Sequence, residues 1–376
     1  MKRVLISGYY GFNNAGDEAM LAAITASLVK ELPDAKLTVI SGDPEATRRR
    51  FKVDSFGRFN LPRLLGAAAR SDLLISGGGS LLQNVTSSRS LFYYLAVIFL
   101  GLIFSGRVML YAQGIGRIRG AFSRRLAGLI LARADLITVR DTASLEELKK
   151  LGAAEKAYVT ADAVLTLPEG DALRGKELLK RFNVPEGKKL IAFSLRPWGK
   201  NESYLAGIAR AADMLAKAEG AAIVLMPLQR VKDLKVLSAM RSLMEEKASA
   251  YILDADFSTK EYLDLAAAFS LVIGMRLHAL VFAALALTPF AALSYDPKVA
   301  AFCREAGGVL AASVEEGSGE VLEGGALSAE QIAQKALRAL KAPKGKNEKI
   351  EKMRRAAREN ARLAARLLNG ESQGEE

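Results

Sequence analysis

The feature that most constrains the fold is an alternation of short apolar runs with segments of helical spacing along most of the chain. The runs have the length of buried strands, and they include residues 3–7, 37–40, 73–76, 108–112, 136–139, 190–195, 222–226, 271–273 and 290–294. Continuous apolar runs of this length, separated by helices, are typical of parallel sheets covered on both faces. We therefore predict an α/β fold with doubly wound, Rossmann-type parallel sheets.

The chain divides into two such series, and its 376 residues are enough for two domains with separate cores. We expect an N-terminal domain at 1–168, a charged linker at 169–187 and a C-terminal domain at 188–342. A basic helix is expected at 343–369 and a disordered tail at 370–376.

The amino-acid composition indicates the kind of partner and the cellular compartment of the protein, but not any reaction that it catalyses. A formal charge of +12 indicates anionic partners, and phosphorylated metabolites, nucleic acid and an acidic membrane face all fit it. Cys303 is the only cysteine, so an internal disulfide is excluded and no cysteine–histidine zinc pattern is present. The apolar run after Met1 is too short for a signal peptide. We expect a cytoplasmic protein with no bound metal.

His278 is the only histidine, and it lies shortly after the predicted strand 271–273. A helix is predicted over 276–287, so Arg276 and His278 fall in its first turn, where backbone N–H groups and the helix dipole favour an anion. This pair predicts a site that binds a phosphate or carboxylate and donates a proton. The alternative is a histidine packed beneath the helix without a chemical role.

Two further cations follow predicted strands of the same half. Arg196 comes after the run 190–195, and Lys298 comes after the run 290–294. The carboxyl ends of parallel strands lie at one edge of a sheet, where open α/β folds bind ligands. We therefore predict that these cations line one ligand-binding edge together with Arg276 and His278.

The first half has polar and glycine-rich strand ends of its own. The loop 8–16 precedes Asp17 and Glu18, and it lacks the G-x-G-x-x-G dinucleotide pattern, so no nicotinamide cofactor is predicted. The two acids are either favourable first-turn residues of a helix or candidates for a hydroxyl-binding base. Other candidates for ligand contacts at these strand ends are Asn14, Gly79, Ser80, Gln83, Arg117 and Arg119.

Two segments raise the question of a membrane surface. The uncharged run 91–104 is too short to span a bilayer, and it is either a helix buried against the sheet or an in-plane membrane contact flanked by Arg89 and Arg107. The C-terminal basic segment carries eleven lysines and arginines against three glutamates between Arg338 and Arg366. It is either a solvated helix packed on the first domain or a helix beside an anionic bilayer.

Five motifs in order resemble the bacterial polysaccharide pyruvyl transferases of the CsaB type. They are Gly-Tyr-Tyr-Gly-Phe-Asn-Asn-Ala-Gly-Asp-Glu at 8–18, Gly-Gly-Gly-Ser-Leu-Leu-Gln at 77–83, Tyr-Ala-Gln-Gly-Ile-Gly at 111–116, Gly-Met-Arg-Leu-His at 274–278 and Ser-Tyr-Asp-Pro-Lys at 294–298. The resemblance extends from the first predicted strand to about Leu340. It implies a GT-B-like pair of Rossmann-type domains facing a cleft.

The resemblance also implies an activity, which is transfer of pyruvate from phosphoenolpyruvate to a cell-wall sugar as a ketal. The histidine of the family's R-L-H motif is taken as the general acid, which carries over to His278, and the basic ligands of the donor carry over to Arg276 and Lys298. Arg119 and Arg196 are further donor candidates. Arg117 departs from the family's loop, which is more often Gly-Pro, so the choice between Arg117 and Arg119 stays open.

The partners implied are phosphoenolpyruvate and a lipid-linked amino-sugar acceptor, N-acetylmannosamine above all, in the cell-wall biogenesis that supports S-layer anchoring. No organic cofactor, metal or nucleic acid is implied, and the inner membrane face is a further candidate partner. Two rival functions remain. One is a GT-B nucleotide-sugar glycosyltransferase, because this architecture supports both chemistries. The other is a non-catalytic module that binds anionic lipid or polymer.

Overall fold

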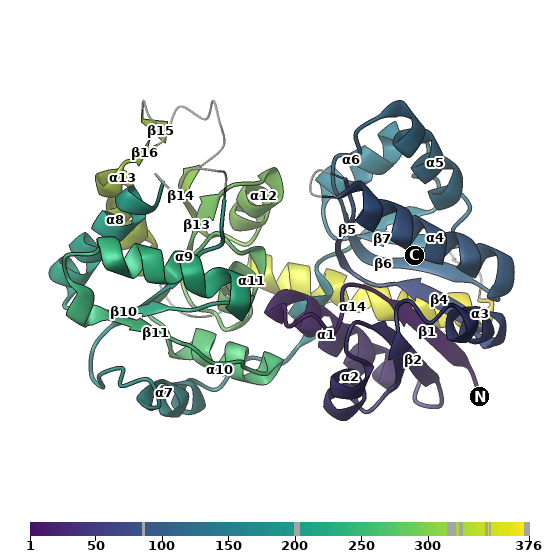
Figure 1. The fold of residues 1–376 in the computed structure, drawn as a ribbon, viewed down its shortest axis with the longest axis horizontal. Helices are drawn as coiled ribbons and strands as arrows, with labels where there is room; N and C mark the ends of the chain where they lie inside the picture. Colours follow the sequence, from purple (N-terminus) through teal and green to yellow (C-terminus); the bar gives the residue numbers. More distant parts are fainter. Residues whose placement is uncertain are drawn as a thin grey trace. The chain divides into compact units, whose positions relative to one another are not determined.

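The structure is a computed structural model, and it describes residues 1–84, 87–198, 204–313, 321–322, 326–342, 345 and 347–371. The chain forms two compact units. Unit 1 comprises Met1–Leu167 and Lys352–Glu376, and unit 2 comprises Pro168–Glu351. Figure 1 labels the elements of both units.

Unit 1 contains an eight-stranded parallel sheet. Its strands are β1 (Arg3–Ser7), β2 (Lys36–Ser41), β3 (Asp54–Gly57), β4 (Leu73–Ser76), β5 (Gly79–Leu82), β6 (Val108–Ile115), β7 (Leu136–Val139) and β8 (Ala157–Val159). They lie in the order β3-β2-β1-β4-β6-β7-β8, and β5 pairs with β6. The central strands β4, β6 and β7 are buried at every position, because helices cover both faces of the sheet.

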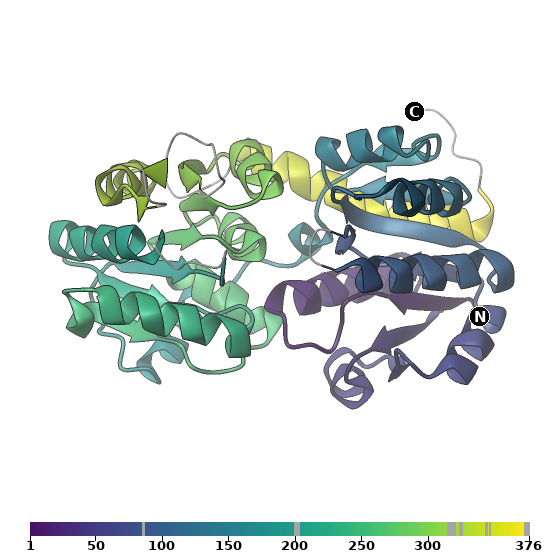
Figure 2. The same cartoon turned by 45° about the horizontal axis from the view of Figure 1, so that its top comes forward.

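The helices of unit 1 form one layer on each face of this sheet. They are α1 (Ala15–Glu31), α2 (Pro44–Phe51), α3 (Leu61–Arg70), α4 (Ser88–Phe104), α5 (Ala121–Leu131), α6 (Thr142–Lys150), the 3₁₀ helix η1 (Ala163–Thr166) and α14 (Glu348–Asn369). Buried residues of α3, α4, α5 and α6 share one core with the sheet. In Figures 1 and 2, α4 and α14 lie on opposite sides of β4 and β6.

Unit 2 contains a six-stranded parallel sheet in the order β11-β10-β9-β12-β13-β14. Its strands are β9 (Leu190–Ser194), β10 (Ala222–Leu225), β11 (Ala250–Ile252), β12 (Leu271–Gly274), β13 (Phe290–Ser294) and β14 (Val309–Ser313), and β15 (Val321–Leu322) pairs antiparallel with β16 (Ala326–Leu327). The helices are α7 (Ala172–Lys180), α8 (Tyr204–Glu219), α9 (Arg230–Leu243), η2 (Lys247–Ser249), α10 (Thr259–Ala268), α11 (Leu277–Leu285), α12 (Pro297–Glu305) and α13 (Ala329–Leu340).

The predicted fold class is therefore confirmed, since both units are parallel α/β sheets of Rossmann type. One local prediction was wrong. The expected linker 169–187 contains α7, whose Gly175 lies against the carbonyl oxygen of Asp264 in α10. The glycine-rich strand end at 77–80 runs into a further strand, β5, in which Gly79 pairs with Gln113 of β6. Most of the predicted tail 370–376 lies outside the described residues.

The basic C-terminal segment folds as α14, and most of it belongs to unit 1. Ala357, Ala361 and Ala364 are fully or almost fully buried, so the helix packs closely there. Buried Asn360 accepts a hydrogen bond from Thr160 Oγ1 at 2.8 Å and donates one to the carbonyl oxygen of Ala161 at 3.2 Å. The apolar stripe of this helix thus packs back on the first domain, and most of its arginines and lysines lie on the outer side. Arg354 is turned inward, where Nη2 donates to the carbonyl oxygen of Leu167 at 3.4 Å. Among the described residues, no helix is both long and apolar enough to cross a bilayer.

Candidate functional site

The carboxyl edge of the unit 2 sheet brings together the predicted cations of the second half. β9, β12 and β13 are consecutive neighbours in the sheet, and Arg196, His278 and Lys298 follow these three strands respectively. Met275 and Arg276 donate backbone hydrogen bonds to the carbonyl oxygen of Ser194, which ties the turn after β12 to the end of β9. The structure therefore places these side chains at one edge of the sheet, the edge at which open α/β folds generally bind ligands.

Arg276 is the N-cap of α11, and its charge is already balanced. Its guanidinium makes a bidentate ion pair with Asp233, in which Nε donates to Oδ2 at 3.0 Å and Nη2 contacts Oδ1. Asp233 is fully buried in α9 and also accepts hydrogen bonds from the backbone N–H groups of Leu228 and Gln229. Arg276 therefore links the start of α11 to the loop after β10, and it brings little net charge to an incoming anion.

His278 is the second residue of α11, so it lies in the first helical turn as predicted. It is partly exposed, and its ring centroid lies 6.4 Å from that of Phe282 one turn later. The helix begins without a side-chain cap, which leaves its first N–H groups without that kind of partner. The histidine thus stands beside a helix N-terminus, where a negatively charged group is favoured.

Arg196 is held by aromatic rings. Its Nη1 donates to the hydroxyl of Tyr295 at 2.8 Å, and its guanidinium carbon lies 4.7 Å from the centroid of the same ring. The ring of Trp198 lies 4.9 Å from that of Tyr295 on centroids. Among the described residues no carboxylate is within ion-pair distance of Arg196, and its buried Nε has no hydrogen-bond partner there. Arg196 is therefore a positioned cation with donor capacity left for a ligand.

Lys298 lies in the first turn of α12. Its Nζ is 3.0 Å from Oδ2 of Asp296, the N-cap of that helix, and both side chains are about one-third exposed. The ion pair is accessible to water, so it is weak and an anionic ligand can compete for the lysine. Arg196 and Lys298 are thus the predicted cations of this edge that are most available to a donor.

In unit 1, the loop after β1 is fixed by Glu18. This carboxylate is 5% exposed, accepts a hydrogen bond from the backbone N–H of Gly11 at 2.7 Å and lies 3.6 Å from Nη1 of Arg50. Burial raises the pKa of Glu18, and the Gly11 hydrogen bond and Arg50 oppose that rise. Asn14, predicted to bind the acceptor, is the N-cap of α1 through its bond from the Gly16 N–H. Both side chains thus shape the loop.

Asp17 is the more accessible of the two predicted acids, and it faces the glycine turn after β4. A side chain at Gly79, whose φ is +104°, would approach Asp17 Oδ1 to 3.4 Å. Burial raises the pKa of Tyr10, and the negative charge of Asp17 adds to the rise. The ring of Tyr10 occupies the space next to Gly8 and Gly77, where any Cβ would lie within 2.3 Å of it. The absence of a side chain at Gly8 and Gly77 therefore leaves room for the ring of Tyr10, whose pKa shows that it lies near Asp17.

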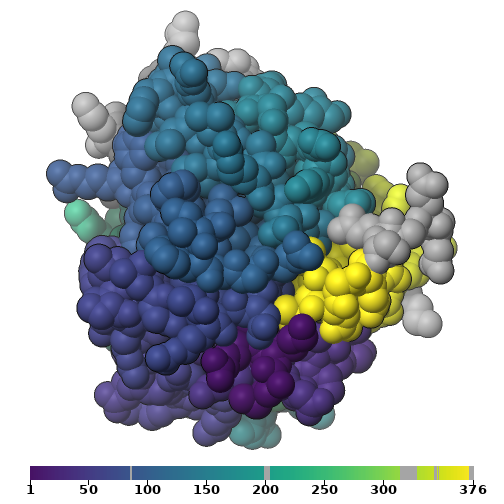
Figure 3. Space-filling view, turned by 90° about the vertical axis from the view of Figure 1, so that its right-hand side faces the viewer, coloured from purple at the N-terminus to yellow at the C-terminus, as the bar shows by residue number. Residues whose placement is uncertain are grey.

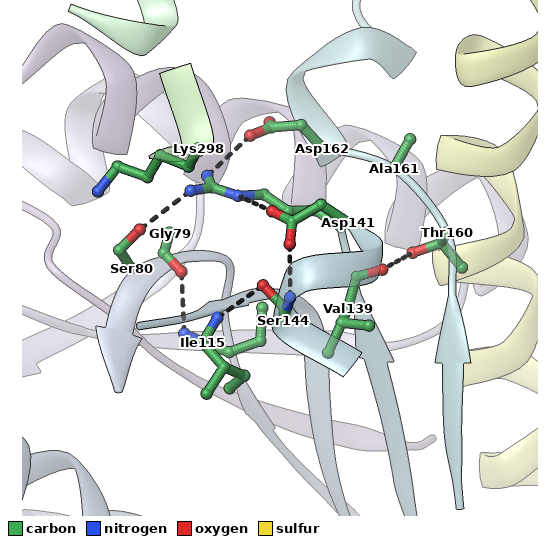
Figure 4. A network of polar contacts seen from close by, with 12 residues as sticks. Gly79, Ser80, Ile115, Val139, Asp141, Ser144, Thr160, Ala161, Asp162 and Lys298 are labelled. Atoms are coloured by element: carbon green, nitrogen blue, oxygen red, sulfur yellow. Dashed lines mark hydrogen bonds and ion pairs between the residues drawn. The ribbon is translucent and has the colours of Figure 1, made fainter. Parts of the chain in front are cut away.

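Arg140, at the end of β7, organises the adjacent strand ends (Figure 4). It is 7% exposed, and Nη1 donates to Asp162 Oδ2 at 3.0 Å while Nη2 donates to Ser80 Oγ at 3.0 Å. Asp141 lies 3.6 Å from Nε. A Cβ at Gly114 would lie 2.8 Å from the guanidinium, so only glycine fits there. The network holds Ser80, a predicted acceptor ligand, in one position.

The remaining predicted residues of unit 1 lie around the end of β6. Arg117 and Arg119 are exposed on either side of buried Ile118, and neither has an ion pair among the described residues. The side-chain amide of Asn84 makes two hydrogen bonds with the backbone of Arg119. Its Oδ1 accepts from the Arg119 N–H at 2.7 Å, and its Nδ2 donates to the Arg119 carbonyl oxygen at 2.9 Å. Gln83 packs against Gly116, where a Cβ would approach it to 2.7 Å.

Three residues of these edges were not identified from the sequence, namely Arg140, Asp233 and Tyr295. Arg140 follows a predicted strand directly, so its position was a usable signal. Asp233 lies inside a helix 43 residues before Arg276, and no local pattern connects the two. Tyr295 is part of the Ser-Tyr-Asp-Pro-Lys motif, but only the fold shows that it holds Arg196.

A family model described as polysaccharide pyruvyl transferase matches residues 14–297. The chain belongs to this family. The match runs from the N-cap of α1 to the first residue of α12, so it covers the predicted site residues of both edges except Lys298. The prediction is therefore confirmed at the level of the polysaccharide pyruvyl transferase family. No curated protein matches the sequence.

Solved structures with the same fold are sugar-nucleotide and glycosyl-transfer enzymes. UDP-GlcNAc 2-epimerase from Neisseria meningitidis, bound to UDP-GlcNAc, has a TM-score of 0.63 at 13% identity, with 98% of this chain and 100% of that chain covered. The UDP-GlcNAc 2-epimerase from Methanocaldococcus jannaschii has a TM-score of 0.63 at 13% identity, covering 97% and 99%. The ADP-heptose LPS heptosyltransferase II of E. coli has a TM-score of 0.52 at 13% identity, covering 90% and 98%. These likenesses show a GT-B-like fold.

Proposed function

We propose that this pyruvyl transferase family member moves the pyruvyl group of phosphoenolpyruvate onto a cell-wall glycan precursor as a ketal, with release of phosphate, as in the CsaB type. The observation that carries the proposal is the carboxyl edge of unit 2. There Arg196 has no carboxylate partner among the described residues, Lys298 has only a water-accessible one, and His278 stands beside a helix N-terminus. A small, highly charged anion is the ligand that this arrangement favours.

In the proposed reaction, Arg196 and Lys298 bind the phosphate and carboxylate of phosphoenolpyruvate, and Arg276 positions the turn that carries His278. His278 donates a proton to the methylene carbon, which becomes a methyl group. The central carbon becomes an oxocarbenium-like electrophile, and an acceptor hydroxyl attacks it and loses its proton to a base. The bond from that carbon to the phosphate oxygen then breaks, and a second hydroxyl closes the ketal as its proton leaves with phosphate.

Asp17 is the better candidate for the base of the two predicted acids. Glu18 is buried and bound to the backbone of its own loop, whereas Asp17 is partly exposed and faces Gly79. A general base must reach the proton that it removes, which favours the accessible carboxylate. Ser80 and Gln83 remain candidates for binding the acceptor near this turn.

The resemblance favours an N-acetylmannosamine unit of a lipid-linked secondary cell-wall precursor. An enzyme acting on such a substrate would work in the cytoplasm at the inner face of the membrane, and its product would serve cell-wall biogenesis and S-layer anchoring. The proposed steps use no metal and no organic cofactor.

The test is release of phosphate from phosphoenolpyruvate with and without a lipid-linked amino-sugar acceptor, combined with mass spectrometry of that acceptor. We expect acceptor-dependent release and a mass gain of one pyruvyl ketal. Consumption of a UDP-sugar with release of UDP, and no reaction of phosphoenolpyruvate, would instead support the glycosyltransferase alternative.

A further inference from the structure

The helices α3, α4 and α5 lie beside one another on one side of the unit 1 sheet, where α4 contacts both of the others. Figure 3 shows the surface at one end of this layer. These helices contain no aspartate or glutamate. Their cations are all arginines, and four of them are exposed, namely Arg63, Arg70, Arg89 and Arg125. An acid-free helical layer of this width is unusual for a solvated surface, on which both signs of charge are normally mixed.

The same layer exposes large apolar side chains. On α4, Phe99 is 49%, Ile103 55% and Phe104 45% exposed, although the opposite side of that helix packs on the core. On α5, Phe122 is 73% and Leu129 51% exposed, and Leu61 of α3 is 54% exposed. The ring of Phe122 lies 6.2 Å from that of Phe92 on α4, so the apolar groups of these two helices adjoin. We call these exposed apolar and arginine side chains the arginine–aromatic face.

We propose that the arginine–aromatic face docks on the surface of an anionic phospholipid bilayer. Phenyl and aliphatic groups would enter the boundary between headgroups and acyl chains, while the arginines bind lipid phosphates. The charge pattern argues against a second copy of the chain as the occupant. A symmetric dimer through this face would bring arginines against arginines with no acid to balance them.

Other helices of unit 1 show what an ordinary solvated surface of this protein looks like. Helix α2 pairs Glu45 with Arg49, and α6 pairs Glu146 with Lys149. On α14, Arg362 pairs with Glu359. These helices mix acids with bases within one or two turns, which suits water and not a uniformly negative surface. The absence of acids therefore distinguishes α3, α4 and α5 from α2 and α14, and also from α6, which packs on the same core but carries Glu146 and Glu147.

The inference deepens the proposed function, because a lipid-linked acceptor would lie in such a bilayer. Its test needs no turnover, so failure of docking and failure of pyruvyl transfer are distinguishable. The probe is the full chain mixed with sucrose-loaded vesicles of phosphatidylcholine alone or of phosphatidylcholine with phosphatidylglycerol, followed by sedimentation. We expect binding to the anionic vesicles that weakens as salt rises, because screening reduces the arginine–phosphate attraction.

Two sets of substitutions separate the apolar and charged contributions. Phe99→Ser, Ile103→Ser and Phe104→Ser together should reduce vesicle partitioning by at least about tenfold, since each removes an apolar group from the lipid boundary. Arg63→Gln, Arg70→Gln and Arg89→Gln should reduce it about fivefold per residue at low salt. Thermal unfolding of each triple variant checks that the fold is kept, because Phe99, Ile103 and Phe104 are about half buried and their replacement lowers stability to some extent.

Matched controls come from α9 of unit 2. Val231 and Leu243 are 89% and 54% exposed, and their joint change to serine should leave partitioning unchanged. A direct readout is a polarity-sensitive dye on Ile103→Cys compared with Val231→Cys. Native Cys303 is buried, and burial raises its pKa to about 11, so it competes little for the label. Only the dye at 103 should shift to the blue on anionic vesicles.

Three outcomes would overturn the proposal. The chain could stay in the supernatant with anionic vesicles, or both triple variants could sediment as the unmodified chain does, which would place any lipid contact elsewhere, such as on α14. Alternatively, light scattering could show a dimer that the serine triple variant loses, which would assign the face to a second copy of the chain.

Discussion

At the carboxyl edge of the unit 1 sheet, Arg140 is flanked by Asp141 and Asp162, whereas at the edge of the unit 2 sheet Arg196 is held by the ring and hydroxyl of Tyr295. The first arginine is a structural cation whose charge is neutralised. The second keeps its charge for a ligand, because an aromatic partner fixes a guanidinium without cancelling it. The difference suits a neutral sugar acceptor at the first edge and an anionic donor at the second.

Within unit 2, the same contrast separates Arg276 from Arg196. Asp233 neutralises Arg276, so motif position alone does not make an arginine a donor ligand. On this view His278 performs the chemistry, Arg196 and Lys298 bind the donor, and Arg276 supports the turn that carries the histidine.

Replacing His278 should have the largest effect on turnover. His278→Gln keeps a polar side chain at this partly exposed position but removes the proton donor, so kcat should fall by about 10²–10⁴-fold while the KM for phosphoenolpyruvate changes little. Steady-state phosphate release measures both quantities. A variant with normal kcat would show that the proton comes from another group and that His278 is only packed beneath the helix.

Breaking the buried pair in unit 2 should affect stability more than donor affinity. Asp233→Asn leaves Arg276 without its counter-ion, and removing one partner of a buried ion pair typically destabilises a protein by about 3–5 kcal/mol. Chemical unfolding gives the loss, and equilibrium binding of phosphoenolpyruvate gives the affinity. Lys260→Gln is the matched control, because its partner Asp264 is also buried but Lys260 itself is exposed. That variant should lose less than about 1 kcal/mol.

Removing the available cation should affect donor binding with little effect on stability. Arg196→Met should raise the KM for phosphoenolpyruvate by about 10–100-fold, since a charge-assisted hydrogen bond is worth about 1.5–3 kcal/mol. Arg196→Lys should recover only part of the affinity, because lysine lacks the planar fork that Tyr295 holds. An unchanged KM in both variants would remove Arg196 from the donor site and favour Arg117 or Arg119.

A substitution at the unit 1 edge should change the KM for the acceptor. Arg140→Lys keeps one charge among Asp141 and Asp162 but cannot also hold Ser80. We expect the acceptor KM to rise by a few-fold to about tenfold and the phosphoenolpyruvate KM to stay constant, because one oriented hydroxyl contact is worth about 0.5–1.5 kcal/mol. A change confined to the phosphoenolpyruvate KM would reverse the assignment of the two edges.

The sequence was sufficient to predict the parallel sheets and the positions where polar residues leave them. The apolar runs have fixed lengths, and the carboxyl ends of parallel strands must share an edge, so Arg196, His278 and Lys298 were placed together correctly. Which of the arginines have a carboxylate partner was not predictable in the same way. Asp233 lies in the first turn of the helix after β10 and Arg276 follows β12, and the two meet because these strands flank β9 in one sheet. The partner of an arginine thus depends on the order of the strands, which the local sequence does not show.

The burial of Asp17 and Glu18, two neighbouring acids of α1, was likewise not predictable from the sequence. The difference between them leads to a prediction about stability and pH. Sequence reasoning left Asp17 and Glu18 equivalent, whereas the fold buries Glu18 and raises its pKa. A carboxyl with a raised folded-state pKa stabilises the fold most below its unfolded pKa, and that contribution is lost as pH rises through the folded pKa. Glu18→Gln, whose amide oxygen still accepts from Gly11, should therefore gain stability relative to the unmodified chain between pH 4 and pH 7, by up to about 1.4 kcal/mol per unit of pKa shift. Urea unfolding across this range measures the gain, with Asp17→Asn as the control. The Asp17→Asn variant should change stability little but lower turnover. If Glu18→Gln lowered turnover instead and Asp17→Asn changed only stability, the roles of the two acids would be exchanged.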